Sequence, residues 1–346
     1  MGSDKIRLIL WGGFGCFGFL VFLLLLKFLS RLEEGRANDV EKAENPRKMR
    51  NPRSLVSERS AAVVPTVLRD FSVGVLEKAT DNFSGLSLIK IGRSGEFFAG
   101  VMEGQEKVVV KRMKMNAEEE EEEGEWRKQV QREVEVHGSQ GSDRYVVPLL
   151  GLCSQNMMVY KFLQNGDLAT ALRRGRGVVD DPLACLSLPW ITRLKIAYET
   201  ARALCHLHYD CYPPVVHKDI KSSSILLTEE FEVRLGSLSH IQVAENEALL
   251  SNDIFCFGKV LLDLISGLDV SGSQDPYAEA WAKKALPYID SGYTDSLLAL
   301  IDPSLVVEED FTREILGVAA LARACLDPNS VKVLTMRDVC QVLHNP

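Results

Sequence analysis

Paired cysteines are missing from this sequence of 346 residues: its eight cysteines are dispersed and form no C-x-x-C motif. That spacing excludes the common zinc sites and a dense disulfide framework, so we expect reduced thiols facing the cytosol. An excess of positive charge is missing too, because the formal net charge is -8, which argues against nucleic-acid binding. Since 46% of the residues are hydrophobic, the chain can bury the core of two or three domains or lobes.

Long apolar runs are also scarce, and the main one lies at the N-terminus. The stretch LILWGGFGCFGFLVFLLLL, Leu8 to Leu26, carries no charge and no proline. About 20 apolar residues are needed to cross a bilayer, so this run predicts a transmembrane helix over residues 8–29. A cleavable signal peptide is the alternative, but its apolar core would be shorter, and no small-residue cleavage site follows.

The charges that flank this run predict its orientation. Lys5 and Arg7 precede it, whereas more basic residues follow it, beginning with Lys27 and Arg31. Basic residues concentrate on the cytoplasmic side, so we expect a single-pass protein of the plasma membrane whose C-terminal part lies in the cytosol. Only residues 1–7 would then lie outside, so we expect no ectodomain that could bind a ligand.

A polar, proline-containing stretch over residues 30–70 is typical of a juxtamembrane linker. Within it, the segment PRKMRNPR at residues 46–53 concentrates four basic side chains. Each Lys or Arg near an anionic leaflet contributes about 1 kcal/mol, so this segment is a candidate for binding anionic lipid headgroups. A merely solvated linker is the alternative interpretation, and the sequence favours neither.

The next stretch, FSVGVLEKATDNFS at Phe71 to Ser84, resembles the start of plant receptor-like Ser/Thr protein kinase domains. From there to Pro346 the order of motifs is similar to that family. The resemblance implies an α+β, two-lobed protein-kinase-like fold, preceded here by the transmembrane helix. We expect a sheet-rich N-lobe over residues 71–164 and a helical C-lobe over residues 165–346.

Two residues of the N-lobe form a candidate ion pair. The run KVVVK, ending at Lys111, is typical of a buried strand, and the following segment Trp126 to His137 has helical periodicity. On that helix Glu133 flanks the apolar stripe and can turn inward. The resemblance implies that Lys111 contacts nucleotide phosphates and pairs with Glu133. The acidic run just before, Glu118 to Glu125, is expected to be a solvated loop.

The nucleotide-binding loop departs from the family. Its G-x-G-x-x-G motif brings bare backbone to the phosphates, but IGRSGEFFAG offers only Gly92 and Gly95 before the next strand. The loop looks about two residues short, which predicts a tight β-hairpin, and Glu96 would add negative charge where phosphates belong. In the hinge MMVYKFLQNGDL, Tyr160 and Phe162 are expected to line an adenine-sized cleft.

The catalytic loop keeps a base and lacks the metal ligands. In HKDIKSSSILL, the resemblance makes Asp219 the base and Lys221 a phosphate contact, with His217 in a structural role. The asparagine that holds magnesium in this family aligns with Ser224, and the aspartate of D-F-G aligns with Ser237. A neutral hydroxyl is a weak ligand for Mg²⁺, which prefers anionic oxygen in octahedral geometry. We therefore expect no metal here and a non-functional Asp219.

The activation segment is largely missing. The stretch NDIFCFGKVLLDLISG resembles the large-lobe helix whose aspartate, here Asp253, would bond to the catalytic-loop backbone. Few positions separate it from Ser237, and no A-P-E triplet lies between them. Near the C-terminus, Val333 replaces the arginine that pairs with the A-P-E glutamate. A buried arginine without that partner would be costly, so we interpret the valine as an adaptation.

These features predict a membrane-anchored pseudokinase that acts as a scaffold or allosteric partner without transferring phosphate. Its expected partners are other membrane receptors or receptor-like kinases, and no nucleic acid. Two alternatives stay open. One is a weakly active ATP-dependent Ser/Thr kinase in which an acid such as Glu96 or Glu230 replaces Ser237. The other is a nucleotide-binding switch without catalysis, and we expect no cofactor beyond ATP bound weakly without magnesium.

Overall fold

The structure is a computed structural model, which describes residues 68–92, 94–113, 120–175, 187–272, 287, 301–305, 309–327 and 329–344. The predicted tail, transmembrane helix and basic segment, at residues 1–7, 8–29 and 46–53, lie outside the described residues. None of the helices in the described part of the chain is long and apolar enough to cross a membrane.

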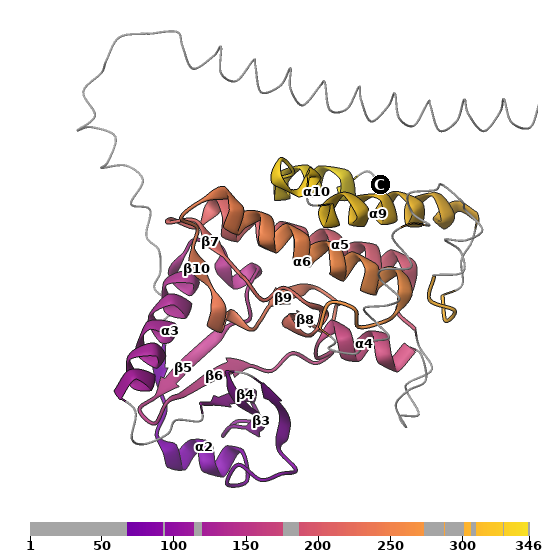
Figure 1. The fold of residues 1–346 in the computed structure, drawn as a ribbon. Helices are drawn as coiled ribbons and strands as arrows, with labels where there is room; N and C mark the ends of the chain where they lie inside the picture. Colours follow the sequence, from indigo (N-terminus) through magenta and orange to yellow (C-terminus); the bar gives the residue numbers. More distant parts are fainter. Residues whose placement is uncertain are drawn as a thin grey trace, which may run out of the picture. The chain divides into compact units, whose positions relative to one another are not determined.

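A six-stranded sheet forms the small lobe, with the strand order β1-β5-β6-β4-β3-β2 (Figure 1). Strand β1 runs parallel to β5, and the other neighbours pair antiparallel. Helices α2 (Val73–Ala79) and α3 (Glu120–Gly138) belong to the same lobe. The strands are β1 (Arg69–Asp70), β2 (Leu88–Gly92), β3 (Gly95–Val101), β4 (Lys107–Arg112), β5 (Leu149–Cys153) and β6 (Met157–Lys161).

Strand β4 shows why this sheet forms. Its β-branched residues suit a pleated surface, and successive side chains point to opposite faces. Val108 and Val110 are fully buried on one face, in a cluster with Leu76 of α2 and Val159 of β6. Val109 belongs to the opposite face and lines a cavity there. The strand therefore separates an apolar core from the candidate site.

Helices dominate the large lobe, where α6 packs against α5 and α9, and α10 packs against α5 (Figure 1). Two short antiparallel pairs, β7 with β10 and β8 with β9, complete it. The helices are α4 (Leu168–Gly175), α5 (Trp190–Cys205), α6 (Glu247–Ser266), α9 (Glu309–Leu326) and α10 (Met336–His344). The short strands are β7 (Val215–Val216), β8 (Ile225–Leu227), β9 (Val233–Leu235) and β10 (Gln242–Val243).

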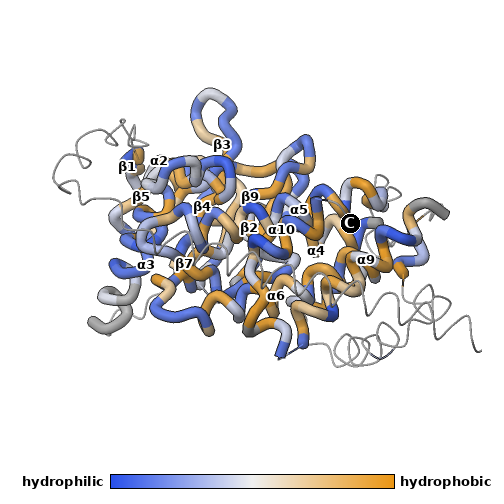
Figure 2. Tube along the Cα trace, turned by 90° about the horizontal axis from the view of Figure 1, so that it is seen from above, coloured by the Kyte–Doolittle hydropathy of each residue, from blue (hydrophilic) through white to orange (hydrophobic). Residues whose placement is uncertain are grey.

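Helix α6 is the central element of this lobe. Figure 2 shows hydrophobic residues recurring along it, as expected for a helix surrounded by others. The side chain of Asn246 caps its first turn by accepting a hydrogen bond from the Leu249 N–H, 3.2 Å away. Close packing on α9 requires Gly258, because a Cβ there would lie 2.8 Å from the Cβ of Cys325.

Two expectations about the fold are wrong. Helix α3 begins at Glu120, so most of the acidic run expected as a loop is helical. Acidic residues near a helix N-terminus complement the helix dipole, which favours this outcome. Val333 is 67% exposed, so an arginine there would not be buried, and the desolvation argument for its replacement does not hold.

A buried ion pair holds the large lobe together, and it yields a stability prediction. Arg193 of α5 donates to the Asp302 carboxylate at 2.6 Å and to the Leu264 carbonyl of α6 at 2.8 Å. Both charged side chains are fully buried. Arg193→Met should lower the free energy of unfolding by about 3–5 kcal/mol, because the Asp302 carboxylate would stay buried without its cationic partner. Denaturant unfolding of the two proteins measures the difference.

The matched control changes a second cation on the same helix. Lys195 lies two positions further along α5 and is exposed. Lys195→Met should change the free energy of unfolding by about 1 kcal/mol or less. Equal effects of the two substitutions would contradict a structural role for the buried pair.

Candidate active site

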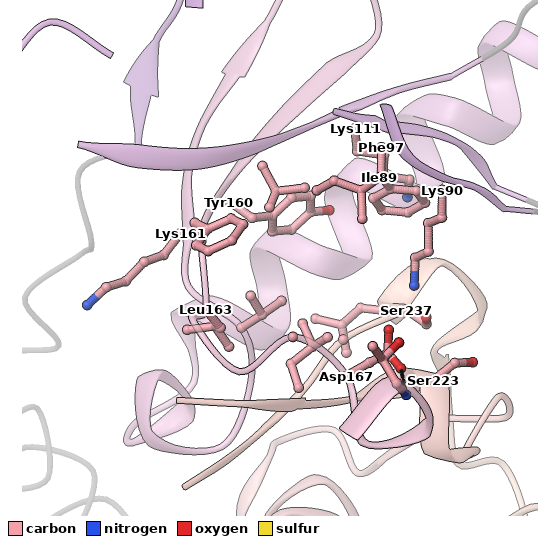
Figure 3. Close-up of a pocket in the computed structure, with 18 of the residues that line it drawn as sticks. Ile89, Lys90, Phe97, Lys111, Tyr160, Lys161, Leu163, Asp167, Ser223 and Ser237 are labelled. Atoms are coloured by element: carbon pink, nitrogen blue, oxygen red, sulfur yellow. Dashed lines mark hydrogen bonds between the residues drawn. The ribbon is translucent and has the colours of Figure 1, made fainter. Parts of the chain in front are cut away.

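A cavity of about 370 Å³ lies between the sheet and the helical lobe (Figure 3). Strands β2, β3 and β4 contribute its roof, and β8 with the segment that follows β9 contributes its floor. Tyr160 and Phe162 of the hinge both line it, as the sequence predicts. The cavity is open rather than filled by side chains, so a small ligand has room.

The turn at the roof is the tight hairpin that the sequence predicts. Gly92 pairs with Gly95 across β2 and β3. Gly95 has a φ of +133°, and a Cβ there would lie 2.5 Å from the Arg112 carbonyl oxygen. A side chain is therefore excluded at Gly95 both by conformation and by space.

The prediction that this loop is two residues short is wrong. The pattern G-x-G-x-x-G-x-V fits at full length when it begins at Lys90. Gly92 and Gly95 then take the second and third glycine positions, and Phe97 takes that of the valine. Phe97 lines the cavity, as this register requires. The first glycine is replaced by lysine, which is why the motif escaped the sequence reading.

Lys90 is the functional candidate that the sequence analysis missed. A β-bulge interrupts the pairing of β2 between Leu88 and Lys90, so the usual alternation of side chains breaks there. As a result two consecutive residues, Ile89 and Lys90, line the same cavity. Burial lowers the pKa of the Lys90 ammonium group, while the carboxylate of Asp167 raises it. A partly desolvated cation therefore faces the cleft.

The two acids considered as substitute metal ligands lie elsewhere. Glu96 forms an ion pair with Arg112 at 2.8 Å and does not line the cavity. It points away because Phe97, its neighbour on β3, faces the cleft and successive side chains alternate. Glu230 follows β8 as an exposed residue, also outside the cavity lining. The expectation that Glu96 places negative charge at the phosphate position is therefore wrong.

The predicted partners Lys111 and Glu133 lie together, with 3.6 Å between Nζ and Oε1, and both are buried. The Tyr160 hydroxyl donates to the other carboxylate oxygen of Glu133 at 2.6 Å. Lys111 also donates to the Ser239 hydroxyl at 2.7 Å, and Gln129 bonds both Ser239 and Glu133. This network joins β4, α3 and β6 to the segment after Ser237.

Burial shapes the electrostatics of this network. It lowers the pKa of Lys111, and the Glu133 carboxylate opposes that shift. Burial also raises the pKa of the Tyr160 hydroxyl, and the same carboxylate adds to the rise, so Tyr160 stays a neutral donor. A desolvated ion pair held by extra hydrogen bonds can fix the small lobe without a ligand.

The catalytic loop brings Asp219 and Lys221 together, with 2.8 Å between the ammonium group and each carboxylate oxygen. Ser224, at the first metal position, is buried. Its hydroxyl donates to the Lys221 carbonyl at 2.7 Å and accepts from the Lys221 N–H at 3.0 Å. Ser237, at the second position, lines the cavity in a left-handed conformation with a φ of 58°. Neither position offers an anionic oxygen.

Asp253 holds this loop from below, as predicted. Its buried carboxylate accepts hydrogen bonds from the His217 N–H at 2.7 Å and the Lys218 N–H at 2.8 Å. A third bond comes from the His208 ring at 3.0 Å. Among the described residues, no group of three or more His, Cys, Asp or Glu side chains is arranged to hold a metal ion.

His217 is held in the neutral form by its contacts. Its Nδ1 accepts from the Asp219 N–H at 3.3 Å, and its Nε2–H donates to the Gly236 carbonyl at 2.8 Å. Burial lowers the pKa of this imidazole below 6.5, against the opposing charges of Asp253 and Asp219. The ring therefore has the structural role that the sequence predicts, since it joins the loop to β9 through Gly236.

A pH dependence of stability follows from His217. The pKa of His217 is lower in the folded protein than its value of 6.5 in the unfolded chain. Between the two pKa values the unfolded chain therefore binds more protons than the folded protein, so stability is lost as the pH falls below 6.5. The loss per pH unit from this group is at most about 1.4 kcal/mol. In denaturant unfolding from pH 7.5 to 5.5, the wild type should lose more stability than His217→Gln. Parallel curves would contradict this role.

Comparison with known proteins identifies the family. Residues 86–253 match the family model described as protein tyrosine and serine/threonine kinase. A probable LRR receptor-like serine/threonine-protein kinase of Arabidopsis thaliana is 39% identical over 305 residues, which cover 80% of this chain and 32% of that protein. Wall-associated receptor kinase-like 14 of the same plant is 32% identical over 299 residues, covering 78% and 40%.

A brassinosteroid LRR receptor kinase of Oryza sativa subsp. japonica is similar as well, with 27% identity over 318 residues, which cover 81% of this chain and 24% of that protein. The chain thus spans less than half the length of these relatives. The motifs, the two lobes and the cleft agree with this similarity. The chain belongs to the protein kinase family, as a relative of the plant receptor-like Ser/Thr kinases.

Proposed function

We propose that this protein is a receptor-like pseudokinase that acts as a scaffold or allosteric partner and does not transfer phosphate. The observation that carries the proposal is the chemistry of the two metal positions. The hydroxyl of Ser224 already bonds the Lys221 backbone, and Ser237 presents only a neutral hydroxyl to the cleft. Phosphoryl transfer needs metal ions to align the phosphates and neutralise charge, and the retained Asp219 cannot supply that.

The path of the chain after Ser237 supports the same proposal. A single 3₁₀ turn over Leu238–His240 leads to β10, which pairs with β7, and α6 follows from Glu247. Within residues 187–272, all of which are described, Ser237 and Asp253 are joined by this short connection and by no long activation segment. A protein substrate would lack the platform that the activation segment provides in kinases.

The contacts that are retained have an architectural use. Lys111, Glu133 and Tyr160 hold the small lobe, and Asp253 holds the catalytic loop. These contacts maintain the shape of a kinase domain, and they do so without phosphate transfer. A surface of that shape suits a partner that recognises kinases, and we propose other membrane receptors or receptor-like kinases as partners.

A phosphotransfer assay tests the proposal. The full-length chain, Asp219→Asn and the double variant Ser224→Asn, Ser237→Asp are incubated with radiolabelled ATP, Mg²⁺ or Mn²⁺, and casein. The wild type should incorporate no more phosphate than Asp219→Asn, because metal ligands are lacking. Transfer by the wild type that Asp219→Asn abolishes would contradict the proposal. The double variant shows whether metal ligands alone restore activity.

We further propose that residues 8–29 anchor the chain in the plasma membrane, with the kinase-like domain in the cytosol. The apolar run and the basic residues after it support this, as do relatives named as receptors. The basic segment 46–53 would add contacts with anionic headgroups.

Fractionation tests the anchor. The full-length chain should stay with membranes after alkaline carbonate washing, and deletion of residues 8–29 should release it, because the apolar segment is lost. Replacing the four basic residues of 46–53 by glutamine should leave the chain in the pellet. Release of the intact chain by carbonate would rule out the anchor.

A nucleotide-binding switch is the second candidate function, and one observation favours it. The cavity of about 370 Å³ is open, and its size is within the range of small-molecule pockets, roughly 300–1,000 Å³.

A further inference from the structure

We propose that the cleft binds a nucleoside polyphosphate without a divalent metal, and that the ammonium group of Lys90 supplies the charge that metal ions supply in kinases. This inference rests on the proposed function, because it concerns the same degenerate cleft. It adds the ligand class and the residue responsible.

The position of Lys90 is the first argument. Figure 3 shows its side chain descending from the roof strand β2 toward Asp167, Ser223 and Ser237 on the opposite wall. Ser237 occupies the metal-binding position of the motif, so the ammonium group points toward the region where a metal ion would neutralise the phosphates. A lysine ammonium carries one positive charge and three hydrogen-bond donors, which suit phosphate oxygens.

The charges around Lys90 are the second argument. Three charged groups act on its ammonium group: the carboxylates of Asp167 and Asp219 attract it, and the ammonium group of Lys221 repels it. Asp219 and Lys221 neutralise each other at 2.8 Å. Asp167 also caps helix α4 by accepting from the Thr170 N–H at 2.8 Å. Among the described residues no ion pair holds Lys90. Its ammonium nitrogen lies 5.2 Å from the centroid of the Phe97 ring, a cation–π contact that leaves its N–H donors for an anion in the cavity.

The deep end of the cavity offers a second cation. Lys111 lines it, although its ammonium group is already bonded to Ser239 and paired with Glu133. A third lysine of the lining, Lys161, points away in Figure 3 and takes no part. A phosphate chain would therefore meet Lys90 and Lys111, one on β2 and one on β4.

A hydrated Mg²⁺ fits this arrangement poorly. It would share the cleft with the Lys90 ammonium group, and like charges repel more strongly in a partly desolvated site than in water. It would also find serine at both ligand positions, and hard cations prefer anionic oxygen. Magnesium bound to the nucleotide would then weaken binding, the reverse of what an active kinase shows.

The remainder of the cavity suits the nucleobase of such a ligand. Ile89 and Val109 line the roof, Leu226 lines the floor, and Phe162 belongs to the hinge side. Apolar side chains around a few polar groups are typical of small-molecule sites. A nucleoside is therefore expected to add affinity beyond that of its phosphates.

Calorimetry and thermal unfolding of the full-length chain test the inference. The probes are ATP with EDTA, ATP with excess Mg²⁺, adenosine, and tripolyphosphate. We expect ATP with EDTA to bind and raise the melting temperature. Excess Mg²⁺ should weaken that binding at least threefold, and adenosine or tripolyphosphate alone should bind more weakly than ATP.

Two variants test the contribution of Lys90 to binding. Lys90→Gln should weaken metal-free ATP binding at least tenfold, and Lys90→Gly, which restores the glycine motif, should do the same. The control Lys78→Gln removes an exposed lysine of α2, paired with Glu103 outside the cleft, and should bind like the wild type. The melting temperature without ligand shows that each variant is folded.

Three results would overturn the inference: no binding of any probe, tighter binding with Mg²⁺, or equal affinities for Lys90→Gln and the control. Tripolyphosphate binding as tight as ATP would overturn its nucleoside part. None of these results would indicate phosphate transfer, because the radiolabel assay tests that activity separately. The failure of one proposal is therefore distinguishable from the failure of the other.

Discussion

The buried carboxylate of Asp253 is the contact on which the candidate site depends. It accepts from two backbone N–H groups of the catalytic loop and from the ring of His208. Without it, the His217 N–H and the His208 ring would be buried and unpaired, at a cost of about 1–3 kcal/mol for each. Because the loop is fixed on α6, the positions of Asp219, Lys221 and Ser224 are fixed as well. The same contact would serve an active kinase and a scaffold equally.

The two walls of the cleft have changed in complementary ways. On the floor, serine stands at both metal positions, so negative charge that would attract a cation is gone. On the roof, Lys90 stands where the motif has glycine, so a positive charge has been added. In the proposed site, charge complementarity toward a phosphate ligand is kept without a metal ion. The proposed loss of catalysis and the proposed anion site are therefore compatible in one structure.

The sequence predicted most of the site because motif order implies a fold, and a fold places its motifs. The Lys111–Glu133 pair, the Gly92–Gly95 hairpin and the hydrogen bonds that Asp253 accepts all follow from that logic. The error at the nucleotide-binding loop concerns how its residues align with the glycine motif. The sequence predicts a nucleotide-binding loop about two residues short, whereas the place of Phe97 in the cavity lining fits a motif of full length that begins at Lys90.

By itself, the sequence determined the family, the two-lobed fold and the absence of anionic side chains at Ser224 and Ser237, because these depend on residue identity and order. Tertiary structure alone decided where side chains point and what they meet. It turned Glu96 toward Arg112 and directed Lys90 into the cleft. It also left Val333 exposed and joined Ser239 to Lys111. Such outcomes depend on strand register, bulges and packing between distant segments, which no local pattern encodes.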